Sequence, residues 1–145
     1  MRAARAVVTR LGGDDRDVLR WSTWAAKAIA GMRVGLGAAA LLAPGLAGRA
    51  WIGPGASGRD RAVTLRALGG RDIALGAGAL LGSSARDELR RWVVVGATSD
   101  LVDALATTIG FGVLPRWRRW LVLAACAGAA TGGFLAAAGL GQDAS

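Results

Sequence analysis

The sequence predicts an all-α polytopic membrane protein, a four-transmembrane-helix bundle with short loops. Two observations predict it. First, 53% of the 145 residues are apolar and the mean hydropathy is +0.40, which is more apolar than usual for a soluble domain of this length. Second, the apolar residues gather in four runs, each close to the ~20 residues that a helix needs to cross a ~30 Å hydrocarbon core.

The four predicted spans form one transmembrane domain, 27–141. They cover approximately 27–46, 62–81, 92–113 and 120–140, and they are separated by Pro44-Gly45, Gly53-Pro54-Gly55, Ser83-Ser84 and Leu114-Pro115. Such short connections make neighbouring helices antiparallel. The second span is interrupted by Arg66, Arg71 and Asp72, so a re-entrant or soluble helix is the alternative there.

Residues 1–26 read as a polar, basic lead-in rather than a cleavable signal peptide, because no apolar core and cleavage site follow the first charges. Four crossings place both termini on one side of the membrane. Lys and Arg are more frequent on that side, in the lead-in and around Arg86, Arg90 and Arg91, than on the other. The positive-inside rule then predicts a multi-pass plasma-membrane protein with cytoplasmic termini.

All six tryptophans lie at the edges of the apolar runs. They are Trp21, Trp24, Trp51, Trp92, Trp117 and Trp120. Tryptophan is enriched where hydrocarbon meets headgroups, so we interpret these residues as interfacial anchors. The alternative is chance placement.

The formal net charge of +8 could indicate a nucleic-acid partner. The arginines, however, occupy every segment between the runs and form no basic stripe or stacking motif. We therefore expect no nucleic acid, and we interpret the arginines as contacts to membrane lipid, the predicted partner.

Five charged residues fall inside the apolar runs: Arg33, Arg71, Asp72, Asp100 and Asp103. An ionised residue at the centre of a span costs about 2.5–3.5 kcal/mol on insertion scales, so such residues face the bundle interior and find partners. At ~1.5 Å per residue, Arg33 lies near the depth of Asp100, and Arg71 near that of Asp103. We predict these two cross-helix pairs, with Asp72 either protonated or sharing Arg71.

Small residues share the helix faces of these charges, as close helix packing in membranes requires. Gly69 and Gly76 fall on the face of Asp72, and Gly37 on that of Arg33. In the fourth span the small stripe contains Ala125, Gly128, Gly132 and Ala136 without a charge. The buried charges then have two interpretations: they fix helix register, or they line a cavity for a proton, an ion or a small polar molecule.

Three apparent signals for chemistry are discounted. Gly35-Leu-Gly37 imitates a dinucleotide-binding turn, but no strand precedes it, so we predict no cofactor. Asp100 and Asp103 lack a third ligand and lie beside arginines, so we predict no metal. The chain has no histidine and one cysteine, Cys126, so neither a hydrolase triad nor an internal disulfide can form, and we predict no catalytic residues.

The segment Ala67-Leu-Gly-Gly-Arg71-Asp72-Ile-Ala-Leu-Gly76, with the later Asp100-Leu-Val-Asp103-Ala, resembles the small four-helix integral membrane proteins of unknown function from bacteria and fungi. Their pattern is G-x-R-D followed by L-G in one helix and Asp-Ala in the next. The likeness covers approximately 28–140 and omits the lead-in. It implies a four-helix membrane fold without an established activity, and it makes Arg71, Asp72 and Asp103 motif positions.

Three functions fit these expectations. The first is a non-catalytic accessory or assembly component, acting as a homo-oligomer or within a larger membrane complex. The second is a small oligomeric transporter or proton-coupled carrier. The third is a membrane enzyme that uses the aspartates as acid and base.

Overall fold

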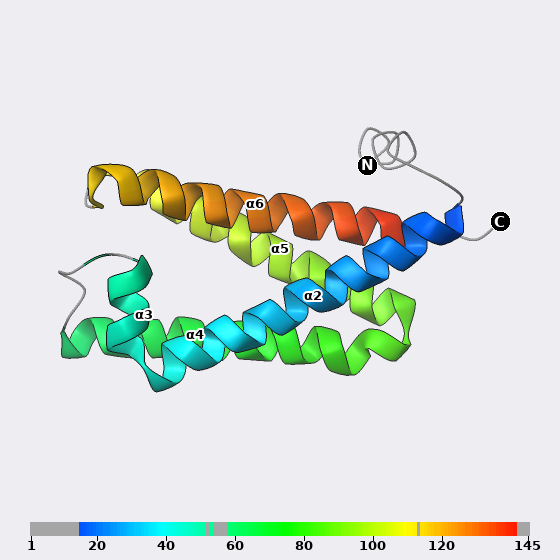
Figure 1. Ribbon diagram of the computed structural model, residues 1–145, viewed down its shortest axis with the longest axis horizontal. Helices are drawn as coiled ribbons and strands as arrows, with labels where there is room; N and C mark the ends of the chain where they lie inside the picture. The colour runs from blue at the N-terminus through cyan, green and yellow to red at the C-terminus, as the bar shows by residue number, and fades with distance from the viewer. Residues whose placement is uncertain (1–14, 52, 54–57, 113, 142–145) are drawn as a thin grey trace.

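The computed structural model describes residues 15–51, 53, 58–112 and 114–141, and this part of the chain is all helical, with no strand (Figure 1). The elements are α2 (Asp15–Leu42), α3 (Pro44–Trp51), α4 (Arg59–Leu81), the 3₁₀ turn η1 (Gly82–Ser84), α5 (Arg86–Ile109) and α6 (Arg116–Leu140). The all-α prediction is confirmed for these residues.

The number of helices differs from the expectation, because the described residues form five α-helices and not four. The additional helix is α3, which begins at Pro44 where we expected only a turn. Proline lacks an N–H and cannot continue α2, but its fixed φ suits the first position of a new helix. The Ala43 carbonyl accepts the first hydrogen bond of α3, from the Ala47 N–H at 3.0 Å.

The first long helix begins at Asp15, earlier than the predicted span start at Lys27. Its first turn contains Asp15 and Asp17, whose negative charges favour a helix N-terminus. Part of the predicted lead-in is therefore helical and includes Trp21 and Trp24, whereas residues 1–14 lie outside the described part of the chain. The pattern of apolar residues predicts which part of a helix could lie in lipid. It does not predict the residue at which the helix begins, because a helix can extend beyond its apolar part.

The four long helices run along the long axis of the molecule as two packed pairs, α2 with α4 and α5 with α6 (Figure 1). Helix α2 lies obliquely, so its first half also contacts α6 while its second half lies on α4. The start of α2, the η1 turn and the end of α6 share one end of the molecule, and α3 lies at the opposite end.

Small residues set the distance between α2 and α4. A Cβ placed on Gly69 would lie 2.5 Å from the Gly37 carbonyl oxygen, and one placed on Gly76 would lie 2.5 Å from that of Ala30. Both residues on each helix are seven positions apart, so two backbone contacts repeat along an antiparallel interface. The small faces predicted for these two helices are the ones that pack.

The small stripe predicted for the fourth span is wrong in its first half. Ala125 and Gly128 are exposed, and α6 instead packs through Ala130, Gly133 and Ala137. A Cβ on Gly133 would lie 2.8 Å from the Ala97 Cβ of α5, so the close approach occurs there. The sequence of the fourth span does not indicate which of its faces packs inward, because alanine and glycine occur on all sides of the helix.

Three helices, α2, α5 and α6, are long and apolar enough to cross a membrane. In their most apolar stretches only 22%, 28% and 28% of the residues are buried inside the protein, so other apolar matter must cover the rest. Large side chains such as Met32, Leu36, Val102 and Leu105 point outward, each more than half exposed. Helix α4 does not meet the same criteria, because Arg66, Arg71 and Asp72 interrupt its apolar run.

Candidate functional site

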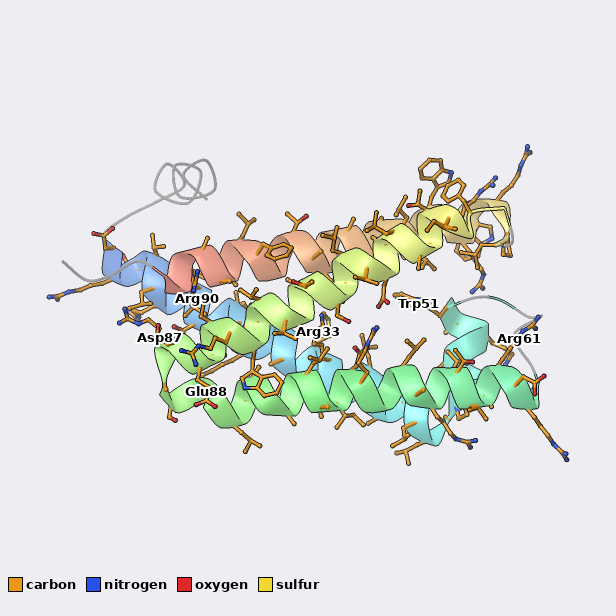
Figure 2. All side chains as sticks on the ribbon, turned by 180° about the vertical axis from the view of Figure 1, so that it is seen from behind. Arg33, Trp51, Arg61, Asp87, Glu88 and Arg90 are labelled. Atoms are coloured by element: carbon orange, nitrogen blue, oxygen red, sulfur yellow. The ribbon has the colours of Figure 1, made fainter. Side chains whose placement is uncertain are left out.

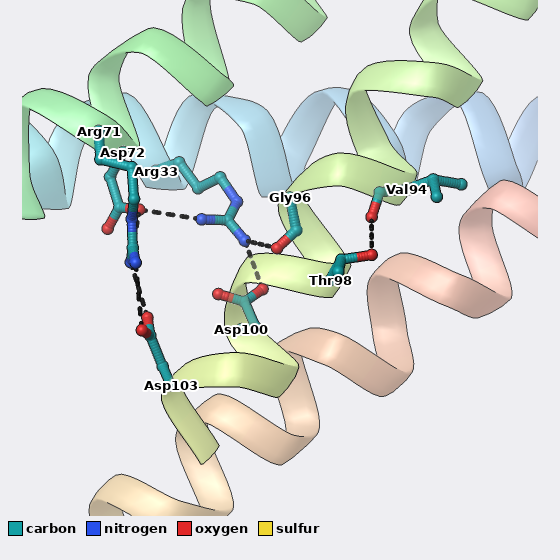
Figure 3. Close-up of polar contacts among 8 residues, drawn as sticks. All are labelled: Arg33, Arg71, Asp72, Val94, Gly96, Thr98, Asp100 and Asp103. Carbon is teal, nitrogen blue, oxygen red and sulfur yellow. Dashed lines mark hydrogen bonds and ion pairs between the residues drawn. The ribbon is translucent and has the colours of Figure 1, made fainter. Parts of the chain in front are cut away.

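Arg33 lies at the centre of the polar cluster, which Figure 3 shows in close-up. It projects from the middle of α2, is only 8% exposed, and reaches both neighbouring helices. Its Nη2 donates to a carboxylate oxygen of Asp100 and, at 2.8 Å, to the Gly96 carbonyl, both on α5. Its Nη1 donates to Oδ1 of Asp72 on α4 at 3.0 Å. One guanidinium therefore joins three helices.

Gly96 allows the Arg33 guanidinium to lie against α5. A Cβ on Gly96 would lie 3.2 Å from the Arg33 Nε, so a larger residue would push the side chain away from α5. The same glycine supplies the carbonyl that accepts from Nη2. Because Gly96 has no side chain and its carbonyl oxygen can accept a further hydrogen bond, the Arg33 guanidinium can approach the backbone of α5 closely.

Arg71 and Asp103 form a two-point pair between α4 and α5. The Arg71 Nη1 donates to Oδ1 of Asp103 at 3.1 Å, and Nη2 donates to Oδ2 at 2.6 Å. This parallel geometry is the strongest form of an arginine–carboxylate contact. The two side chains are 33% and 30% exposed, against 10% and 12% for those of Arg33 and Asp100. The cluster thus has an enclosed half and an accessible half.

Asp72 connects the two halves through a single atom. Its Oδ1 accepts from Arg33 at 3.0 Å and lies 3.5 Å from the Arg71 Nη2. The expected sharing with Arg71 is present, and the shorter contact is with Arg33, which the sequence reasoning did not assign to Asp72. With every group ionised, three carboxylates face two guanidiniums, so the cluster carries one net negative charge.

The structure brings together all five predicted residues, Arg33, Arg71, Asp72, Asp100 and Asp103, from α2, α4 and α5. Both predicted pairs, Arg33 with Asp100 and Arg71 with Asp103, are present. The Gly96 carbonyl was missed as a partner. The signal for it was available, since Gly96 lies one helical turn before Asp100 on the same face.

A small cavity lies beside the enclosed half, between α2, α4, α5 and α6. Arg33, Asp100 and Trp92 contribute to its lining, together with small residues such as Gly96 and Gly133. It offers about 10 Å³ to the centre of a water molecule, roughly the space of one water. In this conformation the cavity has no room for an organic substrate.

The three aspartates of the cluster take part in ion pairs. Each carboxylate faces a guanidinium, and in the described residues no group of three acidic, cysteine or histidine side chains could hold a metal ion.

The six tryptophans do not form one site. Five are well exposed, at 69% for Trp21, 65% for Trp24, 41% for Trp51, 62% for Trp117 and 61% for Trp120. Trp92 differs, because it packs against the buried core and its ring lies over Gly78 of α4. A Cβ on Gly78 would lie 2.7 Å from that ring, so Trp92 packs α5 against α4. This packing role is independent of any role as an interfacial anchor.

Searches against protein-family models, curated proteins and solved structures return no match. The chemistry available to the described part of the chain is that of the polar cluster and of the charged side chains around it. Figure 2 shows how these side chains are distributed, with Arg33 among the helices and Arg61, Asp87 and Glu88 at the two ends.

Proposed function

We propose that this chain is a non-catalytic accessory or assembly subunit of a membrane complex, and that its buried charges hold the helices in register. The carrying observation is that every charged group of the cluster is engaged by another member, around a cavity of about one water. Charged groups that pair with one another in this way offer few free positions to a substrate, and among the described residues the Arg71 Nε is the one buried side-chain nitrogen without a hydrogen-bond partner. Buried polar groups that specify one arrangement of helices are a known use of such pairs.

The proposal includes α4 as a fourth crossing helix. The two charged residues nearest its middle, Arg71 and Asp72, pair with α2 and α5, and their side chains are only 33% and 26% exposed, which lowers the cost of inserting this helix. Arg66 lies nearer the end of α4 and donates from Nε to the Leu41 carbonyl at 3.3 Å. With four crossings both termini lie on one side, which the positive-inside rule makes the cytoplasmic side of the plasma membrane.

The surface of the bundle supports a role in assembly. Large apolar side chains cover the outward faces of α2 and α5. On α2 the exposed Gly31 and Gly35 have open space beside them, so a further helix could approach closely there. The resemblance to small four-helix membrane proteins of unknown function agrees with such a fold. It adds no activity to it.

Copurification from the native membrane tests the proposal. A tagged chain is extracted in a mild detergent, and proteins present in equal amounts are identified by mass spectrometry. Gly69→Ala, which forces α2 and α4 apart, is compared with Gly70→Ala, where a Cβ meets nothing within 4 Å. We expect a stoichiometric partner with the wild type and Gly70→Ala and its loss with Gly69→Ala. A chain that elutes alone and monodisperse from all three preparations contradicts the proposal.

A proton-coupled carrier is the second candidate, favoured by the excess carboxylate and by the partial exposure of Arg71 and Asp103. In liposomes containing the pure chain and a pH-sensitive dye, a carrier would show proton flux under a potassium diffusion potential. Asp72→Asn would remove that flux while the helices stay folded. The accessory role predicts the same slow leak as empty liposomes for both forms.

A further inference from the structure

The end of the molecule at α3 carries arginines with almost no opposing acid. This basic end, as we name it, comprises Arg49, Arg59, Arg61, Arg116, Arg118 and Arg119. Among the described residues at this end the only acidic one is Asp60. The opposite end is mixed, because the first turns of α2 and α5 hold Asp15, Asp17, Asp87 and Glu88 beside its basic residues. Charge is therefore distributed unequally between the two ends.

Arg118 connects the start of α6 to the end of α3 through hydrogen bonds. Its Nη1 donates to the carbonyl oxygens of Arg49 at 2.9 Å and Ala50 at 2.6 Å, which are among the carbonyls that a helix C-terminus leaves without partners. This contact places the Arg49 backbone beside the first turn of α6. Arginines distant in sequence, from α3 and α6, are thereby held at one place.

Aromatic rings, rather than carboxylates, support these guanidiniums. Arg118 lies 4.5 Å from the centre of the Trp117 ring, and Arg119 lies 4.8 Å from that of Phe111. Phe111 in turn meets Trp120 edge-on at 4.8 Å. A cation over a ring keeps its full charge and its outward N–H donors, so both groups can still bind an anion.

The first turn of α6 adds to the positive field. It contains Arg116, Arg118 and Arg119 and no acid, and its N-cap Pro115 makes no side-chain hydrogen bond to the helix. Cations at a helix N-terminus are unfavourable, because the helix dipole already makes that end positive. An anion held by these side chains would relieve this repulsion.

We infer that the basic end binds the headgroup phosphates of anionic phospholipids. Arginine forks match phosphate oxygens in pairs. The exposed rings of Trp51, Trp117 and Trp120 lie at the same end, as expected for a surface at headgroup depth. The start of the apolar run of α6 beside the arginines favours a lipid over a soluble phosphate.

Lipid retention by the full chain tests the inference. The protein is reconstituted into vesicles of phosphatidylcholine and phosphatidylglycerol at four to one and extracted in mild detergent, and the retained lipids are measured by mass spectrometry. We expect phosphatidylglycerol to be enriched over its share of the vesicle. The triple variant R49Q/R116Q/R119Q is expected to reduce the preference for phosphatidylglycerol over phosphatidylcholine by up to about a hundredfold. Arg118 is kept because it joins α3 to α6.

The matched control is R16Q/R20Q/R91Q, which removes the same number of charges from the opposite end and should keep the wild-type preference. R49K/R116K/R119K keeps the charges but loses the paired N–H donors, so it should keep only part of the preference. Circular dichroism checks helix content in each variant. Equal losses in the two glutamine variants, or no enrichment in the wild type, overturn the inference. Displacement of the lipid by millimolar inorganic phosphate also overturns it, by indicating a soluble ligand.

Discussion

Arg33 and Arg71 each pair with an aspartate of α5, yet their surroundings differ. Arg33 and Asp100 are nearly enclosed, whereas Arg71 and Asp103 are about one-third exposed. Removing one member of an enclosed pair leaves a charge in a medium of low dielectric constant, which costs about 3–5 kcal/mol. Removing Asp103 is expected to cost less, because Arg71 then keeps its contact to Asp72 and its long, partly exposed side chain can extend along the bundle.

Asp100→Ala is therefore expected to destabilise the protein by about 3–5 kcal/mol, because Arg33 then keeps only Asp72 and the Gly96 carbonyl. Asp103→Ala should have a clearly smaller effect. The free energy of unfolding is measured by circular dichroism in detergent micelles titrated with sodium dodecyl sulfate. Asp87→Ala, at an exposed position, is the control and should change it by less than about 1 kcal/mol. A larger loss for Asp103→Ala would mean that exposure does not govern these pairs.

Reversing the accessible pair tests whether the two residues act on each other. Arg71→Asp and Asp103→Arg each place like charges together and should destabilise the bundle. The double variant restores an attractive pair and should recover about 1–3 kcal/mol relative to the sum of the single changes. The same micelle titration measures this coupling. Additive effects would show that the contact contributes no pairwise energy.

At the scale of single residues, both ion pairs to α5 could be predicted from the sequence. The rise of a helix and the cost of a charge in lipid were enough to pair Arg33 with Asp100 and Arg71 with Asp103. They were not enough for Asp72, whose neighbour depends on how far α2 lies from α4. That distance is set by Gly37 and Gly69, whose joint effect is visible only once the helices are packed.

At the scale of the helices, α2 and α4 pack closely because glycines at their interface have no side chains. On α4, two adjacent glycines behave differently: Gly69 faces the backbone of α2, while a Cβ on Gly70 would have open space around it. Closely packed positions of this kind do not tolerate added volume, and helices without a large apolar interface depend on them.

Gly69→Ala should lower the free energy of unfolding by about 1–3 kcal/mol, because its methyl group has to displace the α2 backbone. Gly70→Ala should leave it unchanged or raise it by up to about 1 kcal/mol, since alanine is the better helix former. Thermal and detergent-induced unfolding compare the two neighbours directly. Equal effects would place the helix interface elsewhere on α4.

Two elements lay beyond what the sequence could specify. Pro44 both ends one helix and starts another, and a turn and a short helix give the same local signal at that point. In α6 the packing face could not be chosen, because small residues occupy every side of the helix. A charge in that run, such as those in α4 and α5, would have identified the inward face.

Over the whole molecule, the antiparallel order of the long helices places the η1 turn at the end where α2 begins and α6 ends, and α3 at the other end (Figure 1). Three helices have the composition of membrane spans, and α4 joins them only if its charges stay paired. Sidedness at the two ends of α4 therefore decides between three and four crossings.

Cysteine labelling measures that sidedness. In a Cys126→Ala background, Ser84→Cys and Gly58→Cys place single thiols at exposed positions just beyond either end of α4. A membrane-impermeant maleimide should label Gly58→Cys in right-side-out vesicles and Ser84→Cys only in inverted ones. A permeant reagent should label both in either preparation. Labelling of both from the same side would show that α4 does not cross.

The sharing of one Asp72 oxygen has a consequence for how the protein responds to disturbance. Oδ1 receives Arg33 from α2 and Arg71 from within α4. If Arg71 were drawn outward, toward a neighbouring protein or a lipid, that oxygen would be left to Arg33 alone, and the pairing of α4 with α2 would no longer be shared. A change at the accessible half of the cluster would in this way reach the enclosed half through one shared acceptor atom.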